Sequence, residues 1–156
     1  MTTIKSICPW RKNGKPEIDE YGNLCWYDEK AQLHREDGPA FIAPSGDCYW
    51  YINDELHRID GPAIEWASGN KEWWINGKPH RIDGPAIITT SGDCRWFKNG
   101  KYHRIGGPAI EYANGYKQWW VNGKLHREDG PAVECTNGYK EWWIDGKLVR
   151  DKSEQS

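Results

Sequence analysis

The chain has 156 residues, enough for one ordinary domain, and it is rich in Trp (11) and Tyr (8) but poor in Phe (2) and Met (1). Its net charge of −2 provides no field that would attract nucleic acid, so we expect nucleic acid not to be a partner. No apolar run approaches the roughly 18 residues of a membrane span, and five cysteines without a Cys-x-x-Cys pair favour a reducing, cytoplasmic setting.

The first 33 residues form a weaker copy of a unit that then repeats. Trp10 and the pair Trp26-Tyr27 match that unit, one residue out of phase. We therefore interpret residues 1–33 as a degenerate capping repeat, residues 34–147 as five 23-residue hairpin repeats, and residues 148–156 as a C-terminal stub and mobile tail, all within one domain.

The 23-residue period is carried by several motifs, each present in five copies. The motif His-Arg-x-Asp-Gly-Pro-Ala begins at His34, His57, His80, His103 and His126, with Gly106 in place of Asp in the fourth copy. A turn glycine follows at Gly46, Gly69, Gly92, Gly115 and Gly138. An aromatic pair comes next, as Trp50-Tyr51, Trp73-Trp74, Trp96-Phe97, Trp119-Trp120 and Trp142-Trp143, and Asn-Gly-Lys usually closes the unit.

Each unit has the pattern of a β-hairpin. In the second repeat, residues 63–66 form a short strand, Ser68-Gly69-Asn70 a turn, residues 71–75 a second strand, and Asn76-Gly77 another turn. No 3.6-residue periodicity indicates helix. The sequence therefore predicts an all-β, single-domain, open meander of about 11–12 strands that grows by two strands, or roughly 9.6 Å, per repeat.

Alternation along the strands divides the side chains between two faces. We assign three columns to the buried face: the first aromatics, the aliphatic residues of the first strand, and the residues two places after the first aromatics. The aliphatic column is Phe41, Ile64, Ile87, Ile110 and Val133, and the third column is Ile52, Ile75, Lys98, Val121 and Ile144. The second aromatics and the Ala column are assigned to the open face, so Trp96→Ala is expected to cost roughly 3–5 kcal/mol and Phe97→Ala less than half of that. A single sheet also predicts that the buried face is covered by curling, by a second copy or by a partner.

The motif Trp-x-Asn-Gly-Lys-x-His, at Trp74 to His80 and Trp120 to His126, resembles that of MORN repeats, which share the 23-residue period. The resemblance covers about residues 10–150, and departs from MORN units at Arg-x-Asp-Gly-Pro-Ala. It implies an open, twisted stack of hairpins that serves as a protein-interaction or phospholipid-associated module. The His-Arg-x-Asp-Gly-Pro-Ala variant is also similar to repeats of phage and giant-virus proteins, which suggests a virus-encoded accessory protein.

Catalysis, cofactors and metal are not expected. Equivalent histidines should lie about 9–10 Å apart, too far to share one Zn²⁺, and every candidate catalytic group occurs five times whereas active sites are singular. We expect His, Arg and Asp to tie each turn to the next instead. In that interpretation Asp83 accepts turn N–H groups and Arg81 pairs across the repeat boundary.

The sequence predicts a non-enzymatic module that binds a protein partner as a scaffold, adaptor or inhibitor. The candidate binding residues are the second aromatics with the last first aromatic: Tyr51, Trp74, Phe97, Trp120, Trp143 and Trp142. The alternative is a protein that sequesters a small ligand or binds phospholipid, through the aromatic face or through a basic turn edge of Lys78, Arg81, Lys101, Arg104, Lys124 and Arg127. The free C-terminal edge also predicts docking of a partner strand or homodimerisation there.

Overall fold

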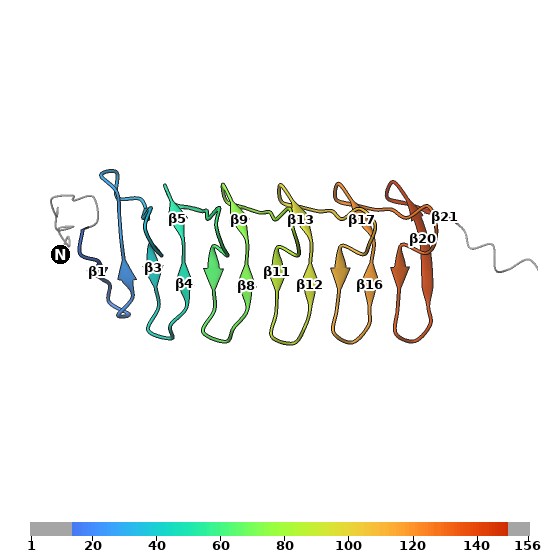
Figure 1. Ribbon diagram of the computed structural model, residues 1–156, viewed down its shortest axis with the longest axis horizontal. Coiled ribbons are helices and arrows are strands. Elements are labelled where there is room, and N and C mark those ends of the chain that lie inside the picture. The colour runs from blue at the N-terminus through green and yellow to red at the C-terminus, as the bar shows by residue number, and fades with distance from the viewer. Residues whose placement is uncertain (1–13, 150–156) are drawn as a thin grey trace, which may run out of the picture.

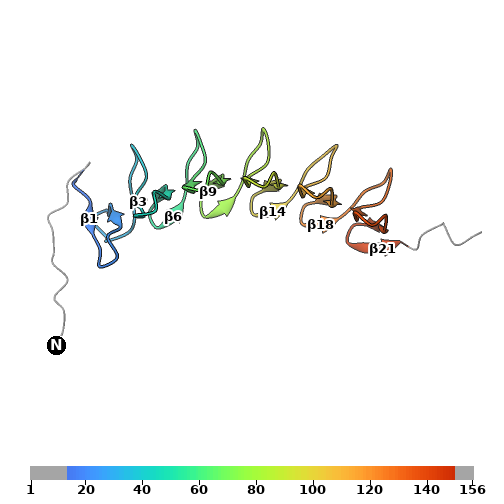
Figure 2. The same ribbon diagram turned by 90° about the horizontal axis from the view of Figure 1, so that it is seen from below.

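The computed structural model describes residues 14–149, which form an elongated row of hairpins that follow one another in chain order (Figure 1). Seen from below, the row bows gently (Figure 2). Within residues 14–149 every regular element is a strand, so no helix with the length and apolar character of a membrane span occurs there. The predicted fold class, an open all-β array of tandem hairpins, is confirmed. Trp10 and residues 150–156, to which part of the cap and the mobile tail were assigned, lie outside the described residues.

Each repeat contributes one long and one short hairpin. The long hairpins build one antiparallel sheet of 13 strands, in the order β1 (Glu17–Ile18), β2 (Leu24–Cys25), β3 (Phe41–Ile42), β4 (Cys48–Tyr49), β7 (Ile64–Glu65), β8 (Lys71–Glu72), β11 (Ile87–Ile88), β12 (Cys94–Arg95), β15 (Ile110–Glu111), β16 (Lys117–Gln118), β19 (Val133–Glu134), β20 (Lys140–Ile144) and β21 (Lys147–Val149). The short hairpins are β5 (Tyr51–Ile52) with β6 (Glu55–Leu56), β9 (Trp74–Ile75) with β10 (Lys78–Pro79), β13 (Phe97–Lys98) with β14 (Lys101–Tyr102), and β17 (Trp120–Val121) with β18 (Lys124–Leu125).

Three of the four short hairpins turn at the Asn-Gly pairs that the sequence indicated, and β5–β6 turns at Asn53-Asp54. Asn76 and Gly77 have φ angles of 49° and 65°, the left-handed values that a two-residue type I′ turn requires of both central residues. The backbone N–H of Gly77 then donates to the carbonyl of Leu56 in the preceding short hairpin (3.0 Å). The short hairpins are therefore stacked from repeat to repeat beside the long sheet.

The second strand predicted for residues 71–75 is divided in two, which raises the strand number above the 11–12 expected. The division falls at Trp73, whose N–H donates to the carbonyl of Ala86 in the next repeat (2.7 Å) and whose carbonyl accepts from the N–H of His80 (3.0 Å). In the last repeat β20 runs without interruption through Trp142. We attribute the break to the hydrogen bond that the first aromatic donates to the alanine carbonyl of the following repeat, because this bond replaces the regular ladder pairing at that residue.

The aliphatic column is covered by longer side chains of the same sheet. Ile64 pairs across the ladder with Tyr49 on one side and Glu72 on the other, and it is buried. Ile110, between Arg95 and Gln118, is buried in the same way. Ile64 and Ile110 are thus buried within one chain, between taller neighbours, whereas Phe41 and Ile87 of the same column are only half-buried. Covering of this face by a second copy or a partner stays a prediction.

The two faces were also assigned incorrectly. The ring centroid of Tyr49 lies 5.3 Å from that of Phe41, in the aliphatic column, and 6.5 Å from that of Tyr51, a second aromatic. In β20, Trp143 Nε1–H donates to Glu141 (2.7 Å), which pairs with Val133 of the aliphatic column. The second aromatics therefore share a side with the aliphatic column, and alternation places Trp142 on the other side.

The burial of individual side chains also disagrees with the predicted assignment of the two faces. The Ala column assigned to the open face (Ala40, Ala63, Ala86, Ala109 and Ala132) is fully buried, and Phe97 is buried at 9% exposure. The first aromatics assigned to the core are only half-buried, and Lys98 is exposed. In the four repeats before the last, the N–H of the first aromatic bonds the Ala carbonyl of the next repeat, so one regular strand does not continue through the aromatic pair. This interruption is why alternation along a single predicted strand did not relate the aromatic pair to the aliphatic column.

Phe97→Ala should therefore cost about 3–5 kcal/mol of unfolding free energy, rather than less than half of that, because it removes a buried ring in the middle of the array. The measurement is the midpoint and slope of urea unfolding. Lys98→Ala, at the exposed neighbouring position of β13, is the control and should stay within about 0.5 kcal/mol of the parent. A loss below about 1.5 kcal/mol for Phe97→Ala would contradict the face assignment derived from the structure.

Candidate functional site

The His-Arg-x-Asp-Gly segments form a row of loops, here called the His-Arg loops: residues 34–38, 57–61, 80–84, 103–107 and 126–130. In each loop the arginine guanidinium lies over the indole of a first aromatic from the preceding repeat unit. The Cζ-to-centroid distances are 4.2 Å for Arg35 on Trp26, 4.1 Å for Arg58 on Trp50, 3.9 Å for Arg81 on Trp73, 3.8 Å for Arg104 on Trp96 and 4.0 Å for Arg127 on Trp119. This contact crosses the repeat boundary as expected of Arg81, although it is a cation–π contact and not an ion pair.

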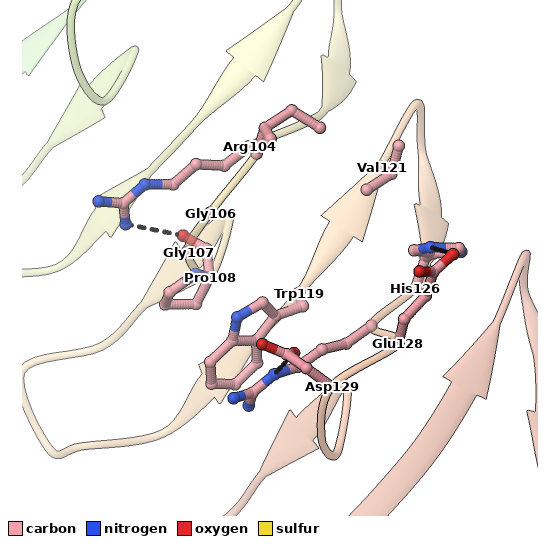
Figure 3. Close-up of a pocket in the computed structure, with 11 residues that line it drawn as sticks. Arg104, Gly106, Gly107, Pro108, Trp119, Val121, His126, Glu128 and Asp129 are labelled. Atoms are coloured by element: carbon pink, nitrogen blue, oxygen red, sulfur yellow. Dashed lines mark hydrogen bonds and ion pairs between the residues drawn. The ribbon is translucent and has the colours of Figure 1, made fainter.

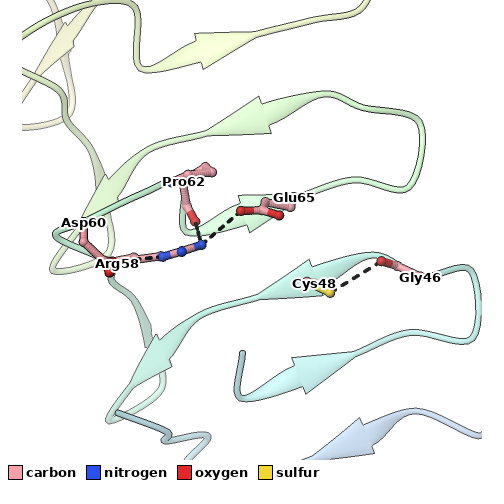
Figure 4. A network of polar contacts seen from close by, with 6 residues as sticks. All are labelled: Gly46, Cys48, Arg58, Asp60, Pro62 and Glu65. Carbon is pink, nitrogen blue, oxygen red and sulfur yellow. Dashed lines mark hydrogen bonds and ion pairs between the residues drawn. The ribbon is translucent and has the colours of Figure 1, made fainter. Parts of the chain in front are cut away.

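Hydrogen bonds fix the stacked guanidinium within its own loop (Figure 4). Arg58 Nε–H donates to Asp60 (3.0 Å), while Nη1–H donates to the Pro62 carbonyl (3.1 Å) and to Glu65 (3.0 Å). We expected the loop aspartates to accept from turn N–H groups, whereas Asp37, Asp60 and Asp129 accept from the arginine two residues earlier. The hydrogen bond from Arg35 lowers the pKa of Asp37, and that from Arg127 lowers the pKa of Asp129.

The loop aspartate is not required for the stack. Arg104 has Gly106 where other loops carry Asp, yet it lies closest to its indole and donates to the Pro108 carbonyl (3.0 Å). The shared elements are thus the tryptophan below and the proline carbonyl beside the guanidinium. A proline follows each of the five loops, and a tryptophan of the preceding unit lies under each arginine.

The histidines link each His-Arg loop to the two-residue turn of the short hairpin that ends the same repeat. His57 Nδ1 lies 2.8 Å from Asn76 Oδ1 and accepts the Asn76 backbone N–H at 3.3 Å. His80 and His103 accept the backbone N–H of Asn99 and Asn122 in the same way, each at 3.1 Å. The prediction that His ties each turn to the next is confirmed. Across the part of the chain that the structure describes, no three His, Cys, Asp or Glu side chains gather as metal ligands would.

The candidate aromatic binding column is packed into the molecule rather than standing free. Tyr51, Trp74, Trp120, Trp143 and Trp142 are half-buried and Phe97 is buried. Trp74 and Trp120 donate their ring N–H to Glu72 (2.9 Å) and Gln118 (3.0 Å). Tyr102 bridges two repeats, with its centroid 4.2 Å from that of Phe97 and 5.5 Å from that of Trp120.

The candidate basic edge is divided by the fold. Arg81, Arg104 and Arg127 are the stacked arginines, whereas Lys78, Lys101 and Lys124 are exposed at the start of β10, β14 and β18. The two sets therefore differ in environment. At the C-terminal edge, Leu148 and Val149 of β21 are exposed, and docking or homodimerisation there stays a prediction.

The sequence analysis missed the residue between Arg and Asp in the His-Arg loops. This position is Ile59, Ile82 and Ile105 in the three central loops, with 84%, 87% and 74% of each residue exposed. In the two outer loops it is Glu36 and Glu128. We call the three residues the isoleucine row. The sequence contained a signal for this row: the position is Glu in two copies, which is typical of an exposed site, yet it is Ile in the other three.

Grooves lie between adjacent His-Arg loops at both ends of the isoleucine row. One, of about 470 Å³, is lined by Ile105, Trp119, Val121, Glu128 and Asp129 among others (Figure 3). The other, of about 450 Å³, is lined by Glu36, Asp37, Trp50, Ile52 and Ile59 among others. Each groove thus combines a tryptophan, two aliphatic side chains and two arginines with carboxylates, of which there are two in the first groove and three in the second.

No protein-family model matches the chain, and a search of curated proteins finds no similar sequence. The fold and the regular loops define a tandem β-hairpin repeat protein.

The arginine stack leaves little room for a side chain at the loop position before proline, which is glycine in every repeat. A Cβ at Gly61 would lie 2.7 Å from Arg58 Cζ, and one at Gly84 would lie 3.3 Å from Arg81 Cζ. Gly61→Ala should therefore lift Arg58 from Trp50 and lower the unfolding free energy by about 1–2 kcal/mol, the size of a partly desolvated cation–π contact.

Gly84→Ala is the matched control, because the wider clearance allows Arg81 to stay in place with a smaller loss of stability. Urea unfolding of both variants, followed by tryptophan fluorescence, measures the difference. Equal losses of unfolding free energy in the two variants would show that the arginine stack is not the reason why glycine occupies this position.

Proposed function

We propose that this chain is a non-enzymatic repeat module that binds a protein partner along the His-Arg loops, and that the isoleucine row is the centre of the contact. The observation that carries the proposal is the exposure of Ile59, Ile82 and Ile105 in register on one row of loops. Single exposed apolar residues are ordinary on protein surfaces, whereas aligned apolar residues with a polar rim are typical of interaction sites.

The fold does not account for the isoleucines. Glu36 and Glu128 occupy the same loop position, and Arg35 and Arg127 still stack on their indoles at 4.2 and 4.0 Å. Isoleucine at this position therefore contributes nothing that the loop needs for folding. A role in binding gives a reason for a solvent-exposed apolar side chain in three consecutive repeats.

The MORN-like assignment belongs to the same proposal. Period and motif support it, and MORN-like arrays serve as interaction modules, which agrees with a scaffold, an adaptor or a virus-encoded inhibitor of a host protein. Phospholipid binding through the basic edge has less support, because its arginines are held by tryptophan, proline carbonyls and, at Arg127, Asp129.

Ile82→Glu should abolish retention of the partner while leaving the fold intact. The measurement is capture from extracts of the encoding organism with the tagged full chain, with quantitative mass spectrometry of the retained proteins. We expect at least a tenfold loss of one retained protein, corresponding to about 1.4 kcal/mol of binding free energy, and a change in stability within about 0.5 kcal/mol.

Ile18→Glu is the control, because Ile18 is equally apolar and 71% exposed but lies in β1, away from the His-Arg loops. It should retain the same protein as the parent chain. Retention of identical proteins in equal amounts by the parent, Ile82→Glu and Ile18→Glu would refute binding through the isoleucine row.

A further inference from the structure

The charges that face solvent on the His-Arg loops are distributed unevenly. In the outer loops Glu36 and Glu128 are 82% and 83% exposed at the side chain, whereas the arginines beside them are only 25% and 22% exposed. Each outer loop also carries an Arg–Asp pair, Arg35 with Asp37 and Arg127 with Asp129, so the arginine does not balance the glutamate. The basic group near each glutamate is the histidine two residues earlier, at 3.9 Å from Glu36 and 3.7 Å from Glu128, and it is charged only when protonated. The row therefore has an apolar centre and two acidic ends.

The two end grooves are suited to long basic side chains. At one end Trp50 and Ile52 line the groove together with Glu36, and at the other end Trp119 and Val121 line it together with Glu128. Two arginines also line each groove, but each is paired with a carboxylate: Arg35 with Asp37, Arg58 with Asp60, Arg104 with Glu111 and Arg127 with Asp129. The glutamates Glu36 and Glu128 therefore remain for a basic side chain. Lys and Arg place their methylenes on apolar surface while the charged head stays at the polar rim. Both grooves offer that combination.

The spacing of the His-Arg loops matches an extended partner segment better than a helical one. Two strands per repeat separate equivalent residues by roughly 9.6 Å. Three residues of polyproline II or extended chain advance about 9.3–10 Å, so every third side chain meets an equivalent loop. A heptad of α-helix advances about 10.5 Å, and the mismatch grows to roughly 3–4 Å over the four intervals between the outer loops. Those intervals cover about 38 Å, or roughly 12 extended residues.

We infer that the partner presents an extended segment of about 12 residues with Lys or Arg near both ends and apolar side chains at about every third position between them. This inference rests on the proposed function, since it names the chemistry of the segment that the isoleucine row binds. The apolar side chains contact Ile59, Ile82 and Ile105, and the basic side chains enter the two end grooves. The same charges argue against a second copy of this row as the occupant, because parallel or antiparallel pairing would bring glutamates together.

A random 14-residue peptide library displayed on phage tests the inference directly. It is selected on the full chain and counter-selected on the Ile59→Glu, Ile82→Glu, Ile105→Glu triple variant. We expect Lys or Arg enriched toward both ends and apolar residues at a three-residue spacing. Enrichment of acidic ends, of a 3–4-residue helical apolar spacing, or of nothing beyond the counter-selected pool would overturn the inference.

The strongest selected peptide is then synthesised, labelled and titrated with the full chain by fluorescence anisotropy. Its dissociation constant should rise at least tenfold with Ile82→Glu. It should also rise about tenfold with the Glu36→Lys, Glu128→Lys double variant in 50 mM salt, and by less in 500 mM salt because salt screens exposed charges. Ile18→Glu should leave the constant unchanged.

The two proposals fail in different ways. A selected peptide that loses affinity with Ile82→Glu but binds the Glu36→Lys, Glu128→Lys variant as tightly as the parent would remove the basic ends and leave the isoleucine row as a binding site. Partner capture that is insensitive to Ile82→Glu would remove the proposed function itself, whatever the library selects.

Discussion

The stack of an arginine on a tryptophan is the interaction on which the repeat depends. Each His-Arg loop runs without regular secondary structure between a short hairpin and the next long one, and the guanidinium fixes it from both sides. The indole lies below at 3.8–4.2 Å, and the proline carbonyl accepts a hydrogen bond at 3.0–3.3 Å in all five loops. Glycine before that proline follows from the same contact, since a Cβ would meet the guanidinium. The position of the stacked arginine thus relates four residue types that recur at fixed spacing in every repeat: the Arg itself, the Gly and Pro that follow it, and the Trp of the preceding unit.

A molecule one sheet thick must bury its core without a second layer. Here short and tall side chains alternate along the long sheet, so that Ile64 is enclosed by Tyr49 and Glu72 on neighbouring strands. The short hairpins add a second aromatic row on the same side, and Phe97, the ring with the least exposure, lies in it. The opposite side is closed by the stacked arginines above the first tryptophans. The two sides therefore use different chemistry, aliphatic and aromatic packing on one and arginine–tryptophan stacking on the other.

The fold could be predicted because turn residues and period are local signals. Asn76-Gly77 specifies its turn by backbone conformation alone, and 23-residue self-similarity requires stacked units. The faces could not be predicted, because Trp73 leaves the ladder to bond Ala86 of the next repeat, which is a contact between units that no property of one strand reveals. The stacking of Arg81 on Trp73 was hidden for the same reason. For the isoleucine row the sequence showed the position, because Ile82 is the variable residue of an otherwise fixed motif. Only the loop geometry showed that this residue is exposed to solvent.

Near-identical units raise the question of how the chain selects one arrangement, since a long hairpin displaced by one whole repeat would find almost the same ladder partners. Repeat proteins are prone to this kind of misassembly. The row of short hairpins distinguishes the units, because the residue paired with the second aromatic is Leu56, Pro79, Tyr102 and Leu125 in turn. Tyr102 contacts both Phe97 and Trp120, and a displaced neighbour would replace one of these rings with another of different shape. The pairs Tyr51–Leu56, Trp74–Pro79 and Phe97–Tyr102 differ from one another and from the Trp–Leu pairs of the last two repeats. The long sheet thus holds the units together, and the differing pairs of the first three repeats oppose a displaced arrangement.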